Sequence, residues 1–115
     1  MREKIRDKER LLHIIEAIEK IQNHTPAINQ ENLKNDALIF YGIVKCIEII
    51  GEAVYKLSSD FKESHPQTAW DDIEGMRHVL VHDYYQIQPD RVWEVISSDL
   101  PQLKIQIEQY IAEMK

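Results

Sequence analysis

The residues best suited to acid–base and phosphate chemistry gather in one stretch, residues 70–85, which reads WDDIEGMRHVLVHDYY. Its last nine residues, 77–85, hold one arginine, two histidines and two tyrosines, inside a run whose apolar pattern otherwise predicts a buried helix. Spacings of three and four residues put one row of side chains on a single helical face: Trp70, Ile73, Arg77, Leu80 and Tyr84. The sequence therefore places a permanent positive charge in an apolar row.

Arg77 has three interpretations that the residues alone leave open. Because an unpaired buried charge is very costly, the guanidinium must find a partner or a cavity. It could be a structural arginine paired with Asp71, Asp72 or Glu74. It could equally bind an anion or take part in catalysis, since charges in unexpected surroundings often mark functional sites. In the third interpretation only its stem is buried and its charge reaches water.

His82 follows Arg77 by five residues, and this spacing limits how the two can act together. Five steps around an ideal helix separate two positions by about 140°. If both side chains serve one site within one chain, the helix must end, loosen or bend near His82. Otherwise the site must be composite, built across two subunits. The residues at 83–88, ahead of Pro89, fit a helix end.

The elements that must position this stretch are predicted to be helices. Residues 2–22 form the first, with an apolar stripe of Leu11, Leu12, Ile15, Ile18 and Ile21. After a connection at 23–30, a second helix capped by Asn29 or Asn32 runs to about Leu57 and carries two adjacent apolar stripes. So wide an apolar face suits either the central helix of a bundle or a helix that also serves a dimer interface. Gly42 and Gly51 inside it suggest a close approach of another backbone, and we favour a dimer.

The second half of the chain supplies the remaining elements. Residues 58–67 read as a polar loop, and a third helix starts at Thr68, with Gly75 as another candidate close contact. A fourth helix opens at Pro89, residues 97–99 read as a break, and a last helix starts at Leu100. We therefore expect an all-α fold over residues 1–115 as a single domain. Its architecture would be an antiparallel four-helix bundle with a short extra helix, assembled as a homodimer.

Composition narrows the classes of function. A net charge of −6 over 115 residues argues against nucleic-acid binding through a broad basic surface, although a local positive cleft remains compatible. The single cysteine, Cys46, lies in an apolar helical run and is interpreted as a core residue in a reducing compartment. His13 and His24 are interpreted as surface or packing residues and His65 as a solvated loop residue, and no pattern of metal ligands or Gly-rich phosphate loop is apparent. We expect no metal, no cofactor, no membrane segment and a cytoplasmic protein.

The order of motifs resembles the HepT-like proteins of the HEPN superfamily, from about residue 33 onward. The main motif behind this resemblance is Arg77-x4-His82-x-Tyr84. It is joined by the following runs: Ile49-Ile50-Gly51-Glu52-Ala53, Trp70-x2-Ile73-x-Gly75-Met76, Val92-Trp93 and Leu100-Pro101-x-Leu103. Many relatives have asparagine after the arginine, where this chain has His78. The resemblance implies a homodimeric helical bundle that is the toxin half of a toxin–antitoxin pair.

The same resemblance implies a metal-independent ribonuclease in which Arg77 and His82 are the catalytic pair. RNA supplies its own nucleophile, the 2′-hydroxyl, while an imidazole moves protons and a guanidinium binds the phosphate oxygens. The expected products are a 2′,3′-cyclic phosphate and a 5′-hydroxyl. A nucleotidyltransferase of the MntA kind would neutralise the toxin by adenylylating Tyr84. His78 and Glu52 are possible supporting residues, each also readable as an ordinary surface or neighbouring side chain.

Two other classes of function remain as alternatives. The chain could be a non-catalytic helical module that binds a nucleotidyltransferase partner or a nucleotide through the same cleft. More remotely, it could be a histidine phosphotransfer bundle with an exposed histidine on a helix. RNA cleavage in the presence of EDTA separates the ribonuclease from the binding module, because only the ribonuclease predicts activity without a divalent metal.

Overall fold

All regular structure in the described part of the chain is helical. A computed structural model describes residues 2–24, 28–82 and 87–114, and gives no side-chain environment for residues 2–5, 81 and 82. The long helices are α1 (Arg2–Gln22), α3 (Ala37–Lys56), α5 (Trp70–His82) and α7 (Leu100–Glu113). The short ones are α2 (Gln30–Asn35), α4 (Ser59–Ser64), α6 (Pro89–Glu94) and the π-helical turn η2 (Val95–Asp99). The prediction of an all-α protein is confirmed.

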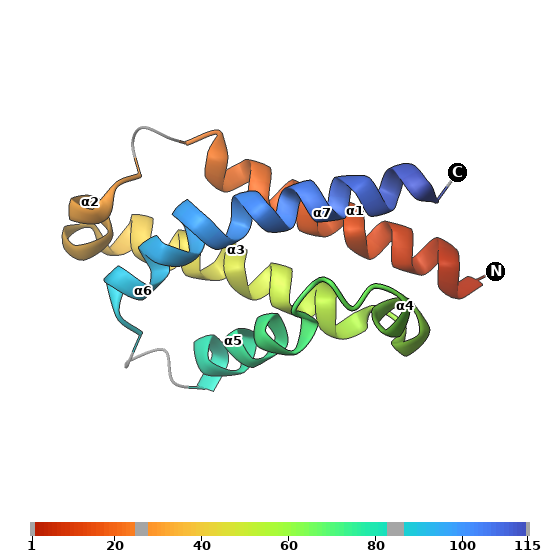
Figure 1. Ribbon diagram of the computed structural model, residues 1–115. Coiled ribbons are helices and arrows are strands. Elements are labelled where there is room, and N and C mark those ends of the chain that lie inside the picture. Colours follow the sequence, from red (N-terminus) through yellow and green to blue (C-terminus); the bar gives the residue numbers. More distant parts are fainter. Residues whose placement is uncertain (1, 25–27, 83–86, 115) are drawn as a thin grey trace.

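The four long helices run alternately in opposite directions, with α3 at the centre (Figure 1). Helix α3 packs against α1, α2 and α5, while α7 packs against α1 and continues directly from η2. This position explains the two apolar stripes of α3, because one helix must cover neighbours on several sides. Within the described residues, no helix is long and apolar enough to cross a membrane.

The apolar stripe of α1 differs from the predicted one. The buried residues are Leu11, Ile14, Ala17, Ile18 and Ile21, whereas Leu12 is 47% exposed. The helix is thus rotated toward Ile14. Asp7, which the stripe did not include, is also buried and accepts hydrogen bonds from the backbone N–H and the hydroxyl of Ser58, at 2.8 and 2.7 Å. These bonds tie the start of α1 to the junction of α3 and α4.

The predicted second helix is two helices, because Asp36 interrupts it. Asn29 caps α2 by accepting the backbone N–H of Asn32 at 2.8 Å, as predicted. Asp36 then accepts the backbone N–H groups of Leu38 and Ile39 at 3.1 and 3.3 Å, which starts α3 anew. A short carboxylate side chain competes with the helix for backbone donors, so it favours a cap over an interior position.

The predicted loop at 58–67 contains the short helix α4, capped by the Ser58 hydroxyl. His65 is part of an aromatic cluster there and is not simply solvated: it stacks on Phe61 with ring centroids 4.1 Å apart and lies 4.5 Å from the ring of Tyr110. The third helix begins two residues later than predicted. Thr68 is buried and shares a 2.6 Å hydrogen bond with the hydroxyl of Tyr110.

Residues 97–99 do not break the chain's last helical run. Helix α6 starts at Pro89 as predicted, but it passes through η2 into α7 without leaving the helical region. A proline clashes with the carbonyl four residues earlier and cannot donate to it. The wider π turn just before Pro101 relieves that conflict while keeping the helix continuous. Leu103, Ile107 and Tyr110 then line the buried side of α7.

Candidate functional site

Arg77 lies on α5 at a point where that helix packs tightly against Gly51 of α3. A methyl group at Gly51 of α3 would overlap the Cβ atom of Arg77 and lie 3.2 Å from its Cγ atom. The close approach predicted at Gly51 is therefore real, but its partner is Arg77 of the same chain rather than a second subunit. At Gly42 and Gly75, no described residue beyond the glycine's own helix backbone and chain neighbours comes within 4 Å of an added methyl group, so the described part of the chain shows no such close contact there.

The charged end of Arg77 lies beside Tyr55, one helical turn beyond Gly51 on the same helix. The central carbon of the guanidinium is 5.3 Å from the centre of the Tyr55 ring, within the range of a cation–π contact. The Nε atom of Arg77 is buried, and it has no hydrogen-bond partner among the residues that the structure describes. A buried donor left unpaired is uncommon and costs about 1–3 kcal/mol.

None of the three carboxylates considered for a structural pair holds Arg77. Glu74 pairs with Lys62 at 2.7 Å, and Asp71 and Asp72 are exposed on α5 without an ion pair to the arginine. Over the described parts of the chain, Arg77 forms no ion pair with any carboxylate. The side chain is half-buried, so its stem is enclosed while its charge remains available to an anion. This excludes the structural pairing with α5's own acids.

The structure describes the other predicted site residues to different extents. Glu52 pairs with Lys56 at 3.3 Å and forms no ion pair with Arg77. His78 is exposed on α5. His82 is the last described residue of α5, and residues 83–86 after it are outside the described part, so the predicted helix end near His82 stays a prediction. The side chain of His82 is outside the described part as well. Tyr84 lies wholly outside the described residues.

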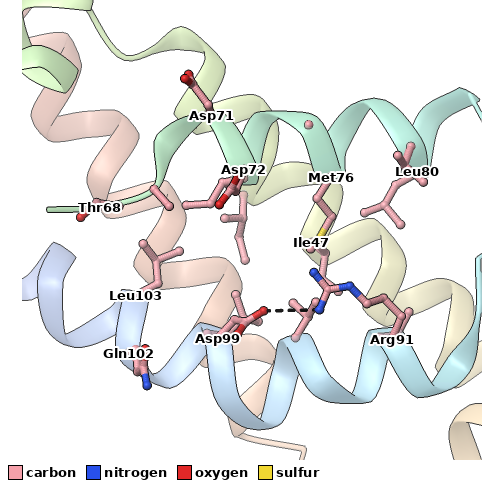
Figure 2. A pocket seen from close by; sticks show the side chains of 18 of the residues that line it. Ile47, Thr68, Asp71, Asp72, Met76, Leu80, Arg91, Asp99, Gln102 and Leu103 are labelled. Carbon is pink, nitrogen blue, oxygen red and sulfur yellow. Dashed lines mark ion pairs between the residues drawn. The ribbon is translucent and has the colours of Figure 1, made fainter. Parts of the chain in front are cut away.

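A cavity of about 770 Å³ opens on another side of α5, between that helix and the run from α6 to α7 (Figure 2). Its walls are mainly apolar, with Met76 and Leu80 pointing in from α5 and Leu103 from α7. Asp72 also points toward it, and Asp99 at its edge pairs with Arg91 at 3.8 Å. Arg77 does not line this cavity. An acidic, apolar cavity repels phosphate groups, so it does not suit RNA.

Two other groups of interest are the Cys46 thiol and any set of side chains that could bind a metal ion. Burial raises the pKa of the Cys46 thiol, which keeps it protonated at neutral pH and fits its interpretation as a packing residue. Within residues 2–24, 28–82 and 87–114, no three histidine, cysteine or acidic side chains are grouped so that they could hold a metal ion.

Tyr55 is the residue near Arg77 that the sequence did not single out. Its signal was present: Tyr55 follows Gly51 by four residues, so both lie on one face of α3. A glycine that admits the arginine stem and an aromatic ring one turn later make a slot for a long cationic side chain. Only the crossing of α3 and α5 shows which side chain occupies that slot.

The chain is similar to known proteins over most of its length. Residues 14–110 match the family model described as "Ribonuclease HepT-like". A protein of Thermococcus cleftensis, named as a probable ribonuclease HepT, is 34% identical over 102 residues, which cover 89% of this chain and 93% of that protein. The protein MJ1216 of Methanocaldococcus jannaschii, named as a candidate RNase, is 33% identical over 105 residues, which cover 91% of this chain and 87% of that protein. No solved structure matches.

Proposed function

The chain belongs to the HepT-like ribonuclease family, and on that premise we propose that it is an RNA endonuclease that works without a metal ion. The observation that carries the proposal is Arg77. Its stem is enclosed by Gly51, and it has no carboxylate partner among the described residues. A guanidinium held in place and left unneutralised is suited to a phosphate, whose oxygens match its fork of donors.

The proposed reaction is a transfer of the phosphoryl group within RNA. The 2′-hydroxyl loses its proton to an imidazole of His82 and attacks the adjacent phosphorus, and the bond from phosphorus to the 5′-oxygen breaks. A protonated imidazole gives its proton to the leaving 5′-oxygen, which yields a 2′,3′-cyclic phosphate and a 5′-hydroxyl. Arg77 stabilises the charge that builds on the phosphate oxygens.

The active form in this proposal is a homodimer with one composite site. Helix α5 continues through His82, and positions 77 and 82 lie about 140° apart around an ideal helix. Two copies of the chain bring two arginines and two histidines to one shared cleft, so one imidazole acts as the base and the other as the acid. The outer face of α3, defined by Leu38, Tyr41, Ile49 and Tyr55, supports this because all four large side chains are exposed.

Regulation in this proposal is by a partner enzyme. An MntA-like nucleotidyltransferase acts as antitoxin by adding AMP to the hydroxyl of Tyr84, two residues after His82. The added group fills the cleft, and its phosphate attracts Arg77 in place of the substrate. The ribonuclease is then the toxin half of a toxin–antitoxin pair.

Purified variants test the catalytic assignment. Arg77→Ala and His82→Ala are each expected to lower RNA cleavage by about a hundredfold or more, because each removes one component of charge stabilisation or proton transfer. Cleavage is measured in EDTA with a labelled RNA and with the same RNA carrying a 2′-deoxy nucleotide at the cleavage position, which should remain intact. The matched control is His13→Ala, an exposed histidine on α1.

Two results would contradict the proposal. The first is cleavage at the parent rate by both variants, which would mean that another group does the chemistry. The second is a parent protein that binds RNA or a partner but does not cleave in EDTA, which is the behaviour of the non-catalytic binding module.

A further inference from the structure

We propose that Tyr55 is a positioning residue that holds the guanidinium of Arg77 in its catalytic orientation. The inference rests on the proposed function, because it concerns how the phosphate-binding group of that site is fixed. No part of the sequence motif contains Tyr55; it comes from the neighbouring helix α3.

The first step of the argument is the enclosure of the arginine stem. Gly51 leaves room for the Cβ and Cγ atoms of Arg77 against the backbone of α3. The first part of the side chain is thus fixed by packing. The last rotatable bonds, which decide where the charge points, lie beyond this contact and need another restraint.

The second step is that the ordinary restraint is missing. A functional arginine is commonly oriented by a carboxylate, but Glu52 pairs with Lys56 and Glu74 pairs with Lys62. Among the described residues the Nε atom of Arg77 has no hydrogen-bond partner either. Among the described residues, therefore, neither an ion pair nor a hydrogen bond from Nε fixes the guanidinium of Arg77.

The third step is that Tyr55 supplies a restraint of another kind. The guanidinium carbon lies over its ring, 5.3 Å from the ring centre. An aromatic face attracts the cation without neutralising it and leaves the edge donors of the planar group facing outward. A carboxylate in the same place would compete with the phosphate. Tyr55 is 60% exposed, so a substrate that binds Arg77 can approach past it.

Three substitutions at Tyr55 test this role. Tyr55→Phe keeps the ring and is expected to retain parent kinetics, and Tyr55→Trp, with a stronger cation–π face, is expected to do the same. Tyr55→Leu removes the ring and is expected to lower kcat about tenfold with little change in KM. The matched control is Ile105→Ala, which shortens an apolar side chain that is 67% exposed on α7, away from the outer face of α3.

A second measurement reports on Arg77 without activity. Because its Nε atom is buried, the Nε–H group should exchange slowly with water and give a distinct ¹H–¹⁵N signal, assigned through its absence in Arg77→Lys. Tyr55→Leu should shift and weaken this signal through faster exchange, whereas Ile105→Ala should not. All variants are compared at a protein concentration where sedimentation shows the same association state as the parent.

The outcomes are distinguishable from those of the proposed function. If Arg77→Ala is inactive while Tyr55→Leu keeps the parent kcat and the parent signal, the positioning role is wrong and the ribonuclease assignment stands. A loss in Tyr55→Leu that appears only in KM, or only with a changed association state, also contradicts positioning. If Arg77→Ala cleaves normally, the proposed function itself fails.

Discussion

At the scale of single residues, the proposed chemistry depends on a charged group whose charge no described neighbour neutralises. Arg77 lacks an ion-pair partner among the described residues, and Tyr55 contacts it without cancelling its charge. Glu52, by contrast, lies in the family-like run on α3 but is engaged with Lys56 on the surface. Surface ion pairs of this kind are worth little in stability, so Glu52 is most simply a solvated carboxylate in this structure.

A prediction at this scale concerns Tyr84. Co-expression with a cognate nucleotidyltransferase should add the mass of one or more AMP units to the parent chain and abolish its growth arrest. Tyr84→Phe lacks the acceptor hydroxyl, so it should gain no mass and remain toxic in the presence of the partner. Tyr85→Phe is the adjacent control and should be modified like the parent. Intact-mass spectrometry and a growth assay measure the two effects, and full modification of Tyr84→Phe would refute the assignment.

At the scale of elements, the contact between α3 and α5 positions the site. Helix α5 packs on α3, with Gly51 directly against Arg77, whereas the cavity of Figure 2 lies between α5 and the run of α6 to α7. The arginine is therefore held by one helix pair rather than by the whole core. Any change that widens this one contact should alter both stability and activity.

Two glycine substitutions on α3 form a matched pair for this contact. Gly51→Ala places a methyl group against Cβ of Arg77, which cannot swing away as a side-chain end can, and should cost about 1–3 kcal/mol in the free energy of unfolding. It should also lower RNA cleavage. Gly42→Ala meets nothing within 4 Å and should raise stability by up to about 1 kcal/mol through helix propensity. Urea unfolding compares them, and equal stability changes would contradict the packing argument.

At the scale of the whole molecule, the apolar residues left outside the core are unevenly placed. The outer face of α3 exposes Leu38, Tyr41, Ile49 and Tyr55, while α7 exposes Ile105 among polar neighbours. Exposed apolar residues that stand singly are ordinary, but several along one helix indicate an interface. The same face borders Arg77 through Tyr55, which is where a second subunit would complete a composite site.

A charge placed on that face should prevent assembly. Ile49→Asp introduces a carboxylate that would be desolvated in the proposed dimer, so it should shift the sedimenting species toward monomer and lower cleavage. Ile105→Asp on α7 is the control: its parent residue is 67% exposed, more than the 39% of Ile49, and the change should leave association unaltered. Monomeric parent protein with full activity would remove the need for a composite site.

What the sequence determined by itself was the pattern of local and amphipathic structure. The spacing of apolar residues predicted the helices, and Asn29 and Pro89 marked two helix starts. These features depend on residues a few positions apart, so the sequence displays them directly. The order of motifs likewise placed the chain in its family.

What only the tertiary structure decided were the contacts between residues far apart in the chain. Gly51 faces Arg77, Asp7 binds Ser58, and His65 packs on Tyr110, none of which follows from periodicity. Two local choices also depended on packing: whether Asp36 ends one helix and caps the next, and whether the chain stays helical before Pro101. In each case the two conformations differ by little free energy until packing selects one. The slot for the arginine exists only where two helices cross, and that crossing is a property of the whole packed chain.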